Sequence, residues 1–246
     1  MNTAFKQLIR QICPEFLLRV ASKSRSVLRN WRTAYAPTST VFTDIYRKNR
    51  WGGESVSGEG SDINQTKSVR DKLPDLLQTY SVRTLLDLPC GTFYWMQKVD
   101  LGGIAYIGGD IVPELIEQNN ARYRSVSREF RVLDLIKDQL PPADLLLCRD
   151  CLIHLSFRDM ESALRNIAQS GIPYLLTTNY PHITLNTDIV TGDFRAINLQ
   201  LAPFRFPKPI TVIPEDIFPK LKDNPNFIRE LALWRTQDIA LGQTRT

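Results

Sequence analysis

Residues 85–96 read LLDLPCGTFYWM, and this stretch decides the fold class of the chain. An apolar run ends at an acid, Asp87, and a turn of small residues, Pro89-Cys90-Gly91-Thr92, follows directly. A buried strand that stops at such a turn usually leaves room for a ligand beyond its end. The turn holds a single glycine, so the sequence first raises the question of which ligand fits there.

Working outward from this stretch, apolar runs alternate with amphipathic segments. We expect strands at 84–88, 105–110, 129–135, 144–150 and 172–179, and helices at 69–80, 113–123 and 158–170. An extended insert at 192–216 and a last strand at 229–237, added at the sheet edge, follow. Strands separated by helices pair in parallel. The predicted fold is therefore an α/β, Rossmann-like sheet of seven mostly parallel strands with helices on both faces, plus an N-terminal helical arm.

Composition and charge bound the functional classes. The chain has 246 residues, of which 43% are hydrophobic and 23% charged, as in ordinary globular proteins. Four cysteines without regular spacing indicate a reducing compartment. Residues 1–50 carry a net charge of +8, whereas residues 51–246 carry −3. A slightly acidic body is a poor surface for nucleic acid, so we expect no nucleic-acid partner.

Residues 1–50 are predicted to form a basic helical arm. Phe5, Leu8, Ile9 and Ile12 follow a helical spacing. The apolar stripe can pack on the body, on a second copy in a homodimer, or on an anionic membrane surface, and these alternatives stay open. We expect a cytoplasmic location, with attachment to the inner membrane face as one alternative. The glycines and serines of residues 43–66 indicate a loop and not a packed element.

Acids stand at the ends of four successive predicted strands. They are Asp87, Asp110, Asp134 and Asp150, the last preceded by Arg149. The carboxyl ends of parallel strands meet at one edge, so these acids favour a shared polar ligand. A dinucleotide needs G-x-G-x-x-G, whereas only Gly91 is present and Phe93 would crowd a pyrophosphate. S-adenosylmethionine (SAM), which has a ribose but no phosphate, fits better.

Four segments of the sequence also carry a family resemblance. LLDLPCGTFYWM, YIGGDI, FRVLDL and DLLLCRDCLIHL resemble motifs I to IV and the following segment of class I SAM-dependent methyltransferases. A bacterial methyltransferase-domain subgroup, with D-x-P-C-G in motif I, is especially similar. The departure from the common glycine-rich motif lies at Pro89 and Phe93. The resemblance implies a SAM-dependent methyltransferase domain over residues 51–246. The acceptor would be a small molecule or a glycan- or lipid-linked group, methylated on oxygen.

The resemblance also assigns cofactor-binding residues. Asp87 and Gly91 would line the methionine part of SAM, Asp110 would bind the ribose hydroxyls, and Asp134 would bind the adenine amino group. The same site is expected to include Pro89, Cys90, Thr92, Ile111, Leu135 and Arg149. An acid at a strand end beside a cleft, such as Asp110, is expected to be wetted in the empty protein.

Acceptor chemistry is expected just after the fourth strand. His154 can take a proton near neutral pH, with Asp150 as a second candidate base. A purely loop-ordering role for His154 stays equally open. We expect Trp51, Tyr180 and Asn198 to contact the acceptor. Tyr46, Trp51 and residues 57–61 form either a lid or a mobile linker.

Three rival interpretations compete with this one. Cys148 and Cys151 have C-x-x-C spacing but lack a second pair, so we expect structural cysteines and no metal site. The missing glycines disfavour an NAD-dependent oxidoreductase. A SAM-binding protein without catalysis, acting as a sensor or partner subunit, remains the alternative function.

Overall fold

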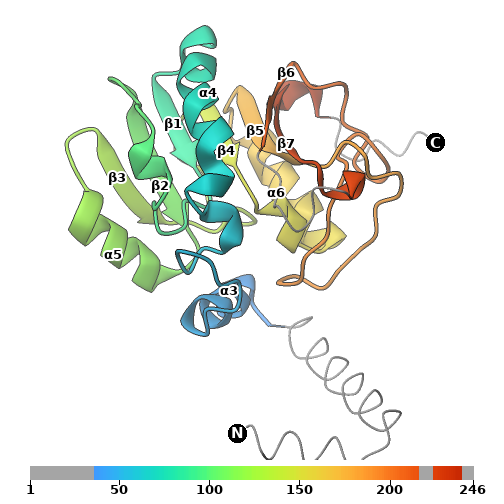
Figure 1. Cartoon of the computed structure of the whole chain (residues 1–246), viewed down its shortest axis with the longest axis horizontal. Helices are drawn as coiled ribbons and strands as arrows, with labels where there is room; N and C mark the ends of the chain where they lie inside the picture. Colours follow the sequence, from blue (N-terminus) through green and yellow to red (C-terminus); the bar gives the residue numbers. More distant parts are fainter. Residues whose placement is uncertain (1–35, 216–223, 240–246) are drawn as a thin grey trace, which may run out of the picture. The chain divides into compact units, whose positions relative to one another are not determined.

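The apolar runs of the sequence form one seven-stranded sheet in the computed structural model, which describes residues 36–215 and 224–239 (Figure 1). The strands are β1 (Thr84–Asp87), β2 (Ala105–Asp110), β3 (Arg128–Val132), β4 (Leu145–Cys148), β5 (Tyr174–Asn179), β6 (Thr211–Pro214) and β7 (Glu230–Arg235). Their order across the sheet is β3-β2-β1-β4-β5-β7-β6. Strands β1 to β5 pair in parallel, and β7 runs antiparallel to both of its neighbours. The predicted seven-stranded, mostly parallel sheet is therefore confirmed.

Helices cover both faces of this sheet. Helices α4 (Lys67–Thr79) and α5 (Pro113–Tyr123) lie on one face and α6 (Phe157–Gln169) on the other, whereas α3 (Thr38–Arg47) lies beyond the carboxyl ends of the strands (Figure 1). Two buried apolar clusters result, because α6 packs with one and α4 and α5 pack with the other. The helix ends follow local chemistry. Pro113 opens α5, the Ser156 side chain caps α6, and Gly171 follows α6 with φ +76°.

Short 3-10 turns connect these elements. They are η1 (Glu59–Ser61), η2 (Asn64–Thr66), η3 (Met96–Lys98), η4 (Leu152–His154), η6 (Pro225–Phe227) and η7 (Thr236–Asp238). Within the described ranges, no helix is both long and apolar enough to cross a membrane.

The C-terminal part of the sheet differs from the prediction. β7 was expected at the sheet edge, but it lies between β5 and β6. β6 is the edge strand, and it comes from the segment for which the sequence predicts an extended insert. Prolines such as Pro214 obscure this strand in the sequence, because proline cannot donate a ladder hydrogen bond and is tolerated at an edge. Two parallel strands are also shorter than expected, since β3 ends at Val132 and β4 at Cys148.

Residues 43–66, predicted to be a loop, begin inside helix α3 and include two 3-10 turns. Val41 and Ile45 of α3 are buried, and η1 and η2 follow before α4. Thr38–Thr246 form one compact unit, so α3 belongs to the unit that carries the sheet. Glycines 52, 53, 58 and 60 hide this packing, because they give the segment the composition of a loop. The predicted helix within residues 1–35 lies outside the described residues.

Candidate active site

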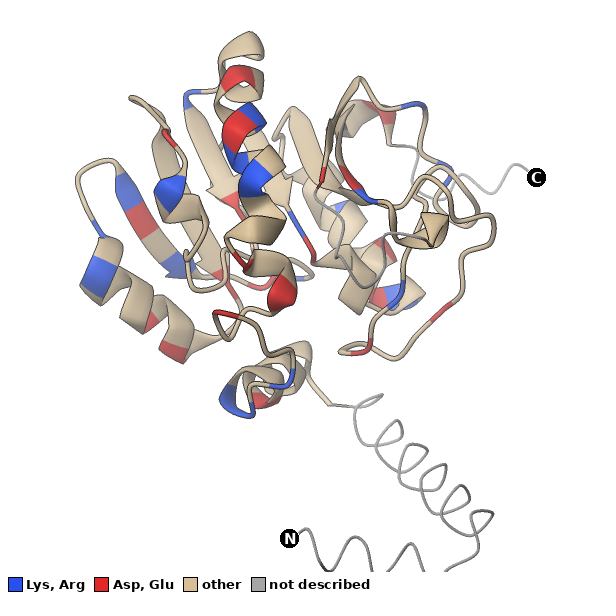
Figure 2. Cartoon of the chain, in the orientation of Figure 1, with Lys and Arg blue, Asp and Glu red and all other residues tan. Residues whose placement is uncertain are grey.

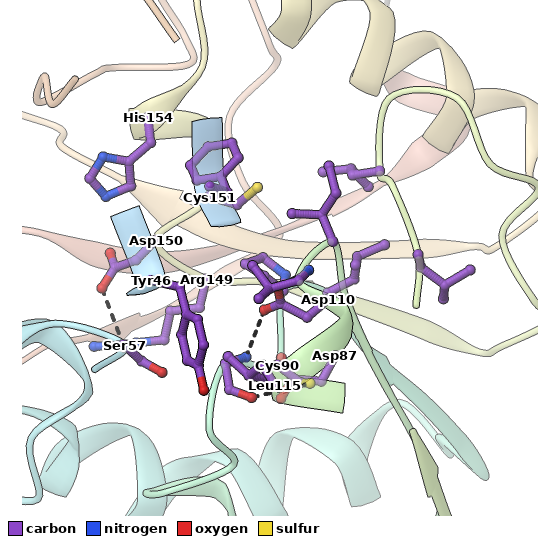
Figure 3. A pocket seen from close by; sticks show the side chains of 18 of the residues that line it. Tyr46, Ser57, Asp87, Cys90, Asp110, Leu115, Arg149, Asp150, Cys151 and His154 are labelled. Atoms are coloured by element: carbon purple, nitrogen blue, oxygen red, sulfur yellow. Dashed lines mark hydrogen bonds and ion pairs between the residues drawn. The ribbon is translucent and has the colours of Figure 1, made fainter. Parts of the chain in front are cut away.

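A cleft lies at the carboxyl edge of the parallel strands. Its empty volume, which includes the solvent at its mouth, is about 1020 Å³. The ends of β1, β2 and β4, the loop after β3, helix α3 and the loop at 51–61 supply its walls. Figure 2 shows acidic positions gathered at this edge of the sheet, and Figure 3 shows the side chains that line the cleft.

The amide N–H groups of residues 90–93, in the turn after β1, all donate hydrogen bonds within the protein. Cys90 N–H donates to the Gly109 carbonyl, and Phe93 N–H donates to the Cys90 carbonyl. Gly91 N–H donates to Asp110 Oδ2 at 3.2 Å, and Thr92 N–H donates to Ser57 Oγ at 2.9 Å. A phosphate group binds to such a turn through unoccupied N–H groups. This turn therefore has no amide left for the pyrophosphate of a dinucleotide.

Gly91 is required at the centre of the turn. Its φ is +52°, a left-handed conformation that favours glycine. A Cβ added here would lie 2.6 Å from Ser57 Oγ. The residue therefore satisfies both the backbone conformation and the close approach of the 51–61 loop.

Three carboxylates lie under the cleft and are held by fixed donors. The Tyr106 hydroxyl donates to Asp87 Oδ2 at 2.6 Å. The Val112 N–H donates to Asp110 Oδ1 at 3.1 Å, and the Ile136 N–H donates to Asp134 Oδ1 at 2.9 Å. Asp87, Asp110 and Asp134 are only 3%, 6% and 6% exposed. The expectation that Asp110 is wetted was wrong, because α3 and the 51–61 loop cover the strand ends.

Burial changes the acidity of two of these groups. It raises the pKa of Asp87 to about 7, although the hydrogen bond from Tyr106 opposes the rise. Burial likewise raises the pKa of Asp110 to about 6, against the backbone N–H donors of Val112 and Gly91. Both carboxyls are therefore poised to become fully ionised when donors from a ligand reach them.

His154 lines the cleft in a defined tautomer. Its Nδ1 lies 2.8 Å from the carbonyl oxygen of Asp193. A carbonyl only accepts hydrogen bonds, so Nδ1 carries the proton and Nε2 keeps a lone pair. The Trp51 ring stacks on the imidazole at 4.7 Å. Burial lowers the pKa of His154 below its usual value, so the ring is neutral at pH 7.

Asp150 has the opposite character. Burial acts to raise its pKa, but the guanidinium groups of Arg229 and Arg149 outweigh burial and hold the pKa at about 2. Arg229 Nη1 lies 3.1 and 3.0 Å from the two carboxylate oxygens. So acidic a group is a weak base, and this favours His154 over Asp150 as the proton acceptor.

The loop at 51–61 is fixed to its surroundings by specific contacts. Trp51 packs against His154 and Phe42, and the Gly60 carbonyl accepts a hydrogen bond from Arg149 Nη2 at 2.8 Å. The cleft is lined by Tyr46, Trp51, Ser57 and Ser61. Of the two alternatives for this segment, the contacts favour a formed lid over a mobile linker.

Most of the predicted site residues come together at the cleft. Those that line it are Trp51, Asp87, Pro89, Cys90, Gly91, Asp110, Ile111, Asp134, Leu135, Arg149, Asp150 and His154. The Arg149 guanidinium contacts Glu215, Asp150 and the Gly60 carbonyl. The cofactor role expected for Arg149 therefore has no support from its contacts.

Three predicted residues do not line the cleft. Thr92 lies behind Ser57, to which its N–H donates. Tyr180 is buried and faces the Phe194 ring edge-on, and burial raises its pKa to about 12. Asn198 is buried and donates to the carbonyls of Pro181 and Ile183, so it braces the insert. Both side chains are engaged in packing within the protein, and their contact with an acceptor stays a prediction.

Sequence reasoning missed several lining residues. They include Phe42, Val56, Trp95, Val112, Leu115, Leu133, Ile136, Cys151 and Leu155. One signal was present for α3, since Phe42 and Tyr46 stand four residues apart and share a helix face. The others are ordinary apolar residues, and such residues carry no local mark of a ligand.

The C-x-x-C pair is reduced and packed. Cys148 is buried, and both Cys148 and Cys151 are outside any disulfide. A hydrogen bond with Cys148, together with burial, raises the pKa of the Cys151 thiol well above its usual value. In the described part of the chain, no group of three or more His, Cys, Asp or Glu residues could hold a metal ion.

Comparison with known proteins adds similarity at the level of the fold. No family model and no curated protein matches the sequence. Human N-acetylserotonin methyltransferase in complex with SAM matches at 18% identity and a TM-score of 0.51, over 81% of this chain and 60% of that one. The N-methyltransferase NodS from Bradyrhizobium japonicum, with S-adenosylhomocysteine (SAH), matches at 15% identity and 0.55, over 78% and 97%.

A third match is the Burkholderia thailandensis 1,6-didemethyltoxoflavin-N1-methyltransferase with bound 1,6-didemethyltoxoflavin and SAH. It is 14% identical, with a TM-score of 0.52, over 80% of this chain and 86% of that one. The chain has the fold of class I SAM-dependent methyltransferases. This confirms the fold class predicted from the sequence, whereas identities this low leave the chemistry to the chain's own residues.

Proposed function

We propose that the chain is a SAM-dependent methyltransferase that methylates a hydroxyl group. The turn after β1 carries this proposal, since all four amides of residues 90–93 are already engaged while carboxylates surround the cleft. A ligand with hydroxyl and amino donors and no phosphate suits such a site. SAM has these groups, and NAD requires the amides that are occupied.

Each carboxylate has a proposed partner on the cofactor. Asp110 accepts hydrogen bonds from the ribose hydroxyls, Asp134 binds the adenine amino group, and Asp87 with Gly91 holds the methionine part. These assignments come from the resemblance of the motifs, and the burial of the three acids near the cleft supports them. When bound, SAM supplies the methyl group on its sulfonium.

His154 is the proposed general base. Its Nε2 takes the proton of the acceptor hydroxyl as the oxygen forms a bond to the methyl carbon. The carbon–sulfur bond breaks in line, sulfur keeps the electron pair, and a methyl ether and SAH result. Alignment of the two substrates supplies the larger share of the rate enhancement. The neutral, Nδ1-protonated imidazole supports this role.

The acceptor is proposed to be a small molecule, free or as part of a glycan or lipid-linked group. Contact of the basic arm with a membrane surface and formation of a homodimer also remain proposals. The D-x-P-C-G form of motif I supports placement in the similar bacterial subgroup.

Calorimetry with SAH and NAD tests the cofactor. We expect SAH to bind and NAD to bind much more weakly, so tighter binding of NAD would refute the proposal. Turnover of SAM to SAH with an added acceptor tests the chemistry. SAH binding without turnover by any acceptor would instead identify a non-catalytic SAM-binding protein.

A further inference from the structure

Four charged side chains form a closed ring beside His154. Arg149 Nε lies 2.7 Å from Glu215 Oε1, and Arg229 Nε lies 2.5 Å from Glu215 Oε2. Arg229 Nη1 and Arg149 Nη1 lie 3.0 and 3.3 Å from Asp150 Oδ2. Two cations and two anions therefore alternate around the ring, and its net charge is zero.

Asp150 is the member of the ring whose side chain is most exposed at the cleft. The side chains of Glu215, Arg149 and Arg229 are 0%, 4% and 4% exposed, whereas that of Asp150 is 21% exposed. Asp150 lines the cleft together with His154. Figure 3 shows both side chains at one end of the cleft, away from Asp87 and Asp110. Asp150 therefore presents a carboxylate at the acceptor end.

The position of this carboxylate is tightly determined. Asp150 has φ +50°, and its N–H donates to Thr178 Oγ1 at 2.9 Å. The Thr178 hydroxyl donates back to Asp150 Oδ1 at 3.2 Å. Gly60 closes the other side, because a Cβ there would lie 2.6 Å from Asp150 Oδ2. A carboxylate held in one position in this way is suited to bind a hydrogen-bond donor of a ligand.

We infer that the methyl acceptor is an uncharged ring with two adjacent hydroxyl groups. One of them is methylated, and the other donates a hydrogen bond to the carboxylate of Asp150. One hydroxyl faces His154 and the other faces Asp150. The inference rests on the methyl transfer proposed above and names the acceptor class for that site. The hydroxyl at His154 loses its proton and is methylated, whereas the hydroxyl at Asp150 keeps its proton and is not.

Charge and shape both support an uncharged ring. Among the described residues that line this end of the cleft, the charges of Arg149 and Asp150 are compensated within the ring of ion pairs. A charged acceptor would therefore lose its hydration without gaining a counter-ion. Trp51, which stacks on His154, and Phe42, which packs against Trp51, add flat aromatic walls at this end, and such walls pack well against a saturated or an aromatic ring.

Paired probes test this inference on the full-length protein saturated with SAH. Catechol is compared with phenol, and cyclohexane-1,2-diol with cyclohexanol, by ligand-observed NMR. We expect one diol to bind about tenfold or more tightly than its single-hydroxyl partner, as for loss of a hydrogen bond to a charged group. A preference for catechol indicates an aromatic acceptor, and a preference for cyclohexanediol indicates a sugar-like one. Equal binding within both pairs, or no binding of either diol, overturns the inference.

Two matched variants separate recognition from ring integrity. Asp150→Asn and Glu215→Gln each remove one negative charge from the same ring of ion pairs, but only Asp150 reaches the cleft. We expect Asp150→Asn to abolish the preference for the diol and Glu215→Gln to retain it. A preference that survives Asp150→Asn refutes the inference. SAH affinity, measured beside it, checks folding, and failure of the unmodified protein to bind SAH would refute the proposed function instead.

Discussion

Asp110 links the proposed cofactor chemistry to pH at the scale of single residues. Burial raises its pKa to about 6 in the folded protein, above the usual 3.8. Protonation therefore stabilises the empty protein, and this contribution is complete below about pH 4 and lost as the pH rises through 6. Ribose hydroxyls donate to the ionised carboxylate, so SAH should bind more tightly as the pH rises and Asp110 loses its proton.

The first prediction concerns the pH dependence of SAH binding. SAH should bind roughly tenfold more weakly at pH 5 than at pH 7, because the ionised fraction of Asp110 falls about tenfold. Asp110→Asn should weaken binding at pH 7 about tenfold or more and reduce the pH dependence. Calorimetry across this range measures both effects. Asp75→Asn, at an exposed position on α4, is the control, and an unaltered pH dependence in Asp110→Asn would contradict the assignment.

His154 carries the second prediction. His154→Asn retains a donor for the Asp193 carbonyl but removes Nε2, so the transfer rate should fall by about 10²- to 10⁴-fold while SAH affinity stays within about twofold. In the unmodified protein the rate should fall only at a pH below that at which an ordinary imidazole becomes protonated, since burial lowers the pKa of His154. Single-turnover kinetics measure the rate. The exposed His182→Asn is the control, and a larger loss of SAH affinity than in Asp110→Asn would argue against the role.

Contact between two segments controls the site at the scale of elements. The turn after β1 and the 51–61 loop meet where Ser57 Oγ accepts the Thr92 N–H. This contact depends on the absence of a side chain at Gly91. Gly102 has a similar φ of +54°, but nothing lies within 4 Å of a Cβ placed there. Substitution of Gly102 therefore tests backbone strain alone, whereas substitution of Gly91 adds a steric conflict with Ser57.

The third prediction uses this pair. Gly102→Ala should lower the free energy of unfolding by roughly 1–2 kcal/mol through its left-handed conformation alone. Gly91→Ala should cost about 1–3 kcal/mol more, because Ser57 must move. Gly91→Ala should also weaken SAH binding, and Gly102→Ala should not. Denaturant unfolding and calorimetry measure these changes. Equal effects of the two substitutions would show that the 51–61 loop moves aside at no cost and would contradict the prediction.

The boundary of the compact unit matters at the scale of the whole molecule. The sequence places the end of the basic arm at residue 50, whereas the compact unit begins at Thr38. Phe42 and Tyr46 of α3 line the cleft. The arm's basic charge therefore lies mostly before α3, and the cleft depends on residues after it.

The fourth prediction compares two truncations. Removal of residues 1–37 should leave SAH affinity nearly unchanged, because the compact unit retains every lining residue. Removal of residues 1–50 also deletes α3, so affinity should fall at least about tenfold and the melting temperature should drop. A protein lacking residues 1–37 that fails to bind SAH would show that the arm is part of the site.

Local patterns were enough to predict the parallel strands and the acids that end them. An apolar run followed by Asp87, Asp110 or Asp134 indicates a strand and its end, because this pattern involves only residues that are close together in the sequence. The sequence also predicted that these acids lie at the same edge of the sheet, because the carboxyl ends of parallel strands share one edge. The cleft, its acids and His154 were predictable for this reason.

Packing over long sequence distances decided the rest. Arg149 and Asp150 meet Glu215 and Arg229 only because β7 enters the sheet between β5 and β6, and no local pattern specifies that position. The same holds for α3, whose loop-like surroundings conceal a helix that is stabilised by the burial of Val41 and Ile45. Polar residues such as Tyr180 and Asn198 look the same in the sequence whether they contact a ligand or stabilise a turn, and only their contacts in the fold distinguish the two roles. Ion pairs, burial and side-chain direction depend on partners far away in the sequence, and only the folded chain brings those partners together.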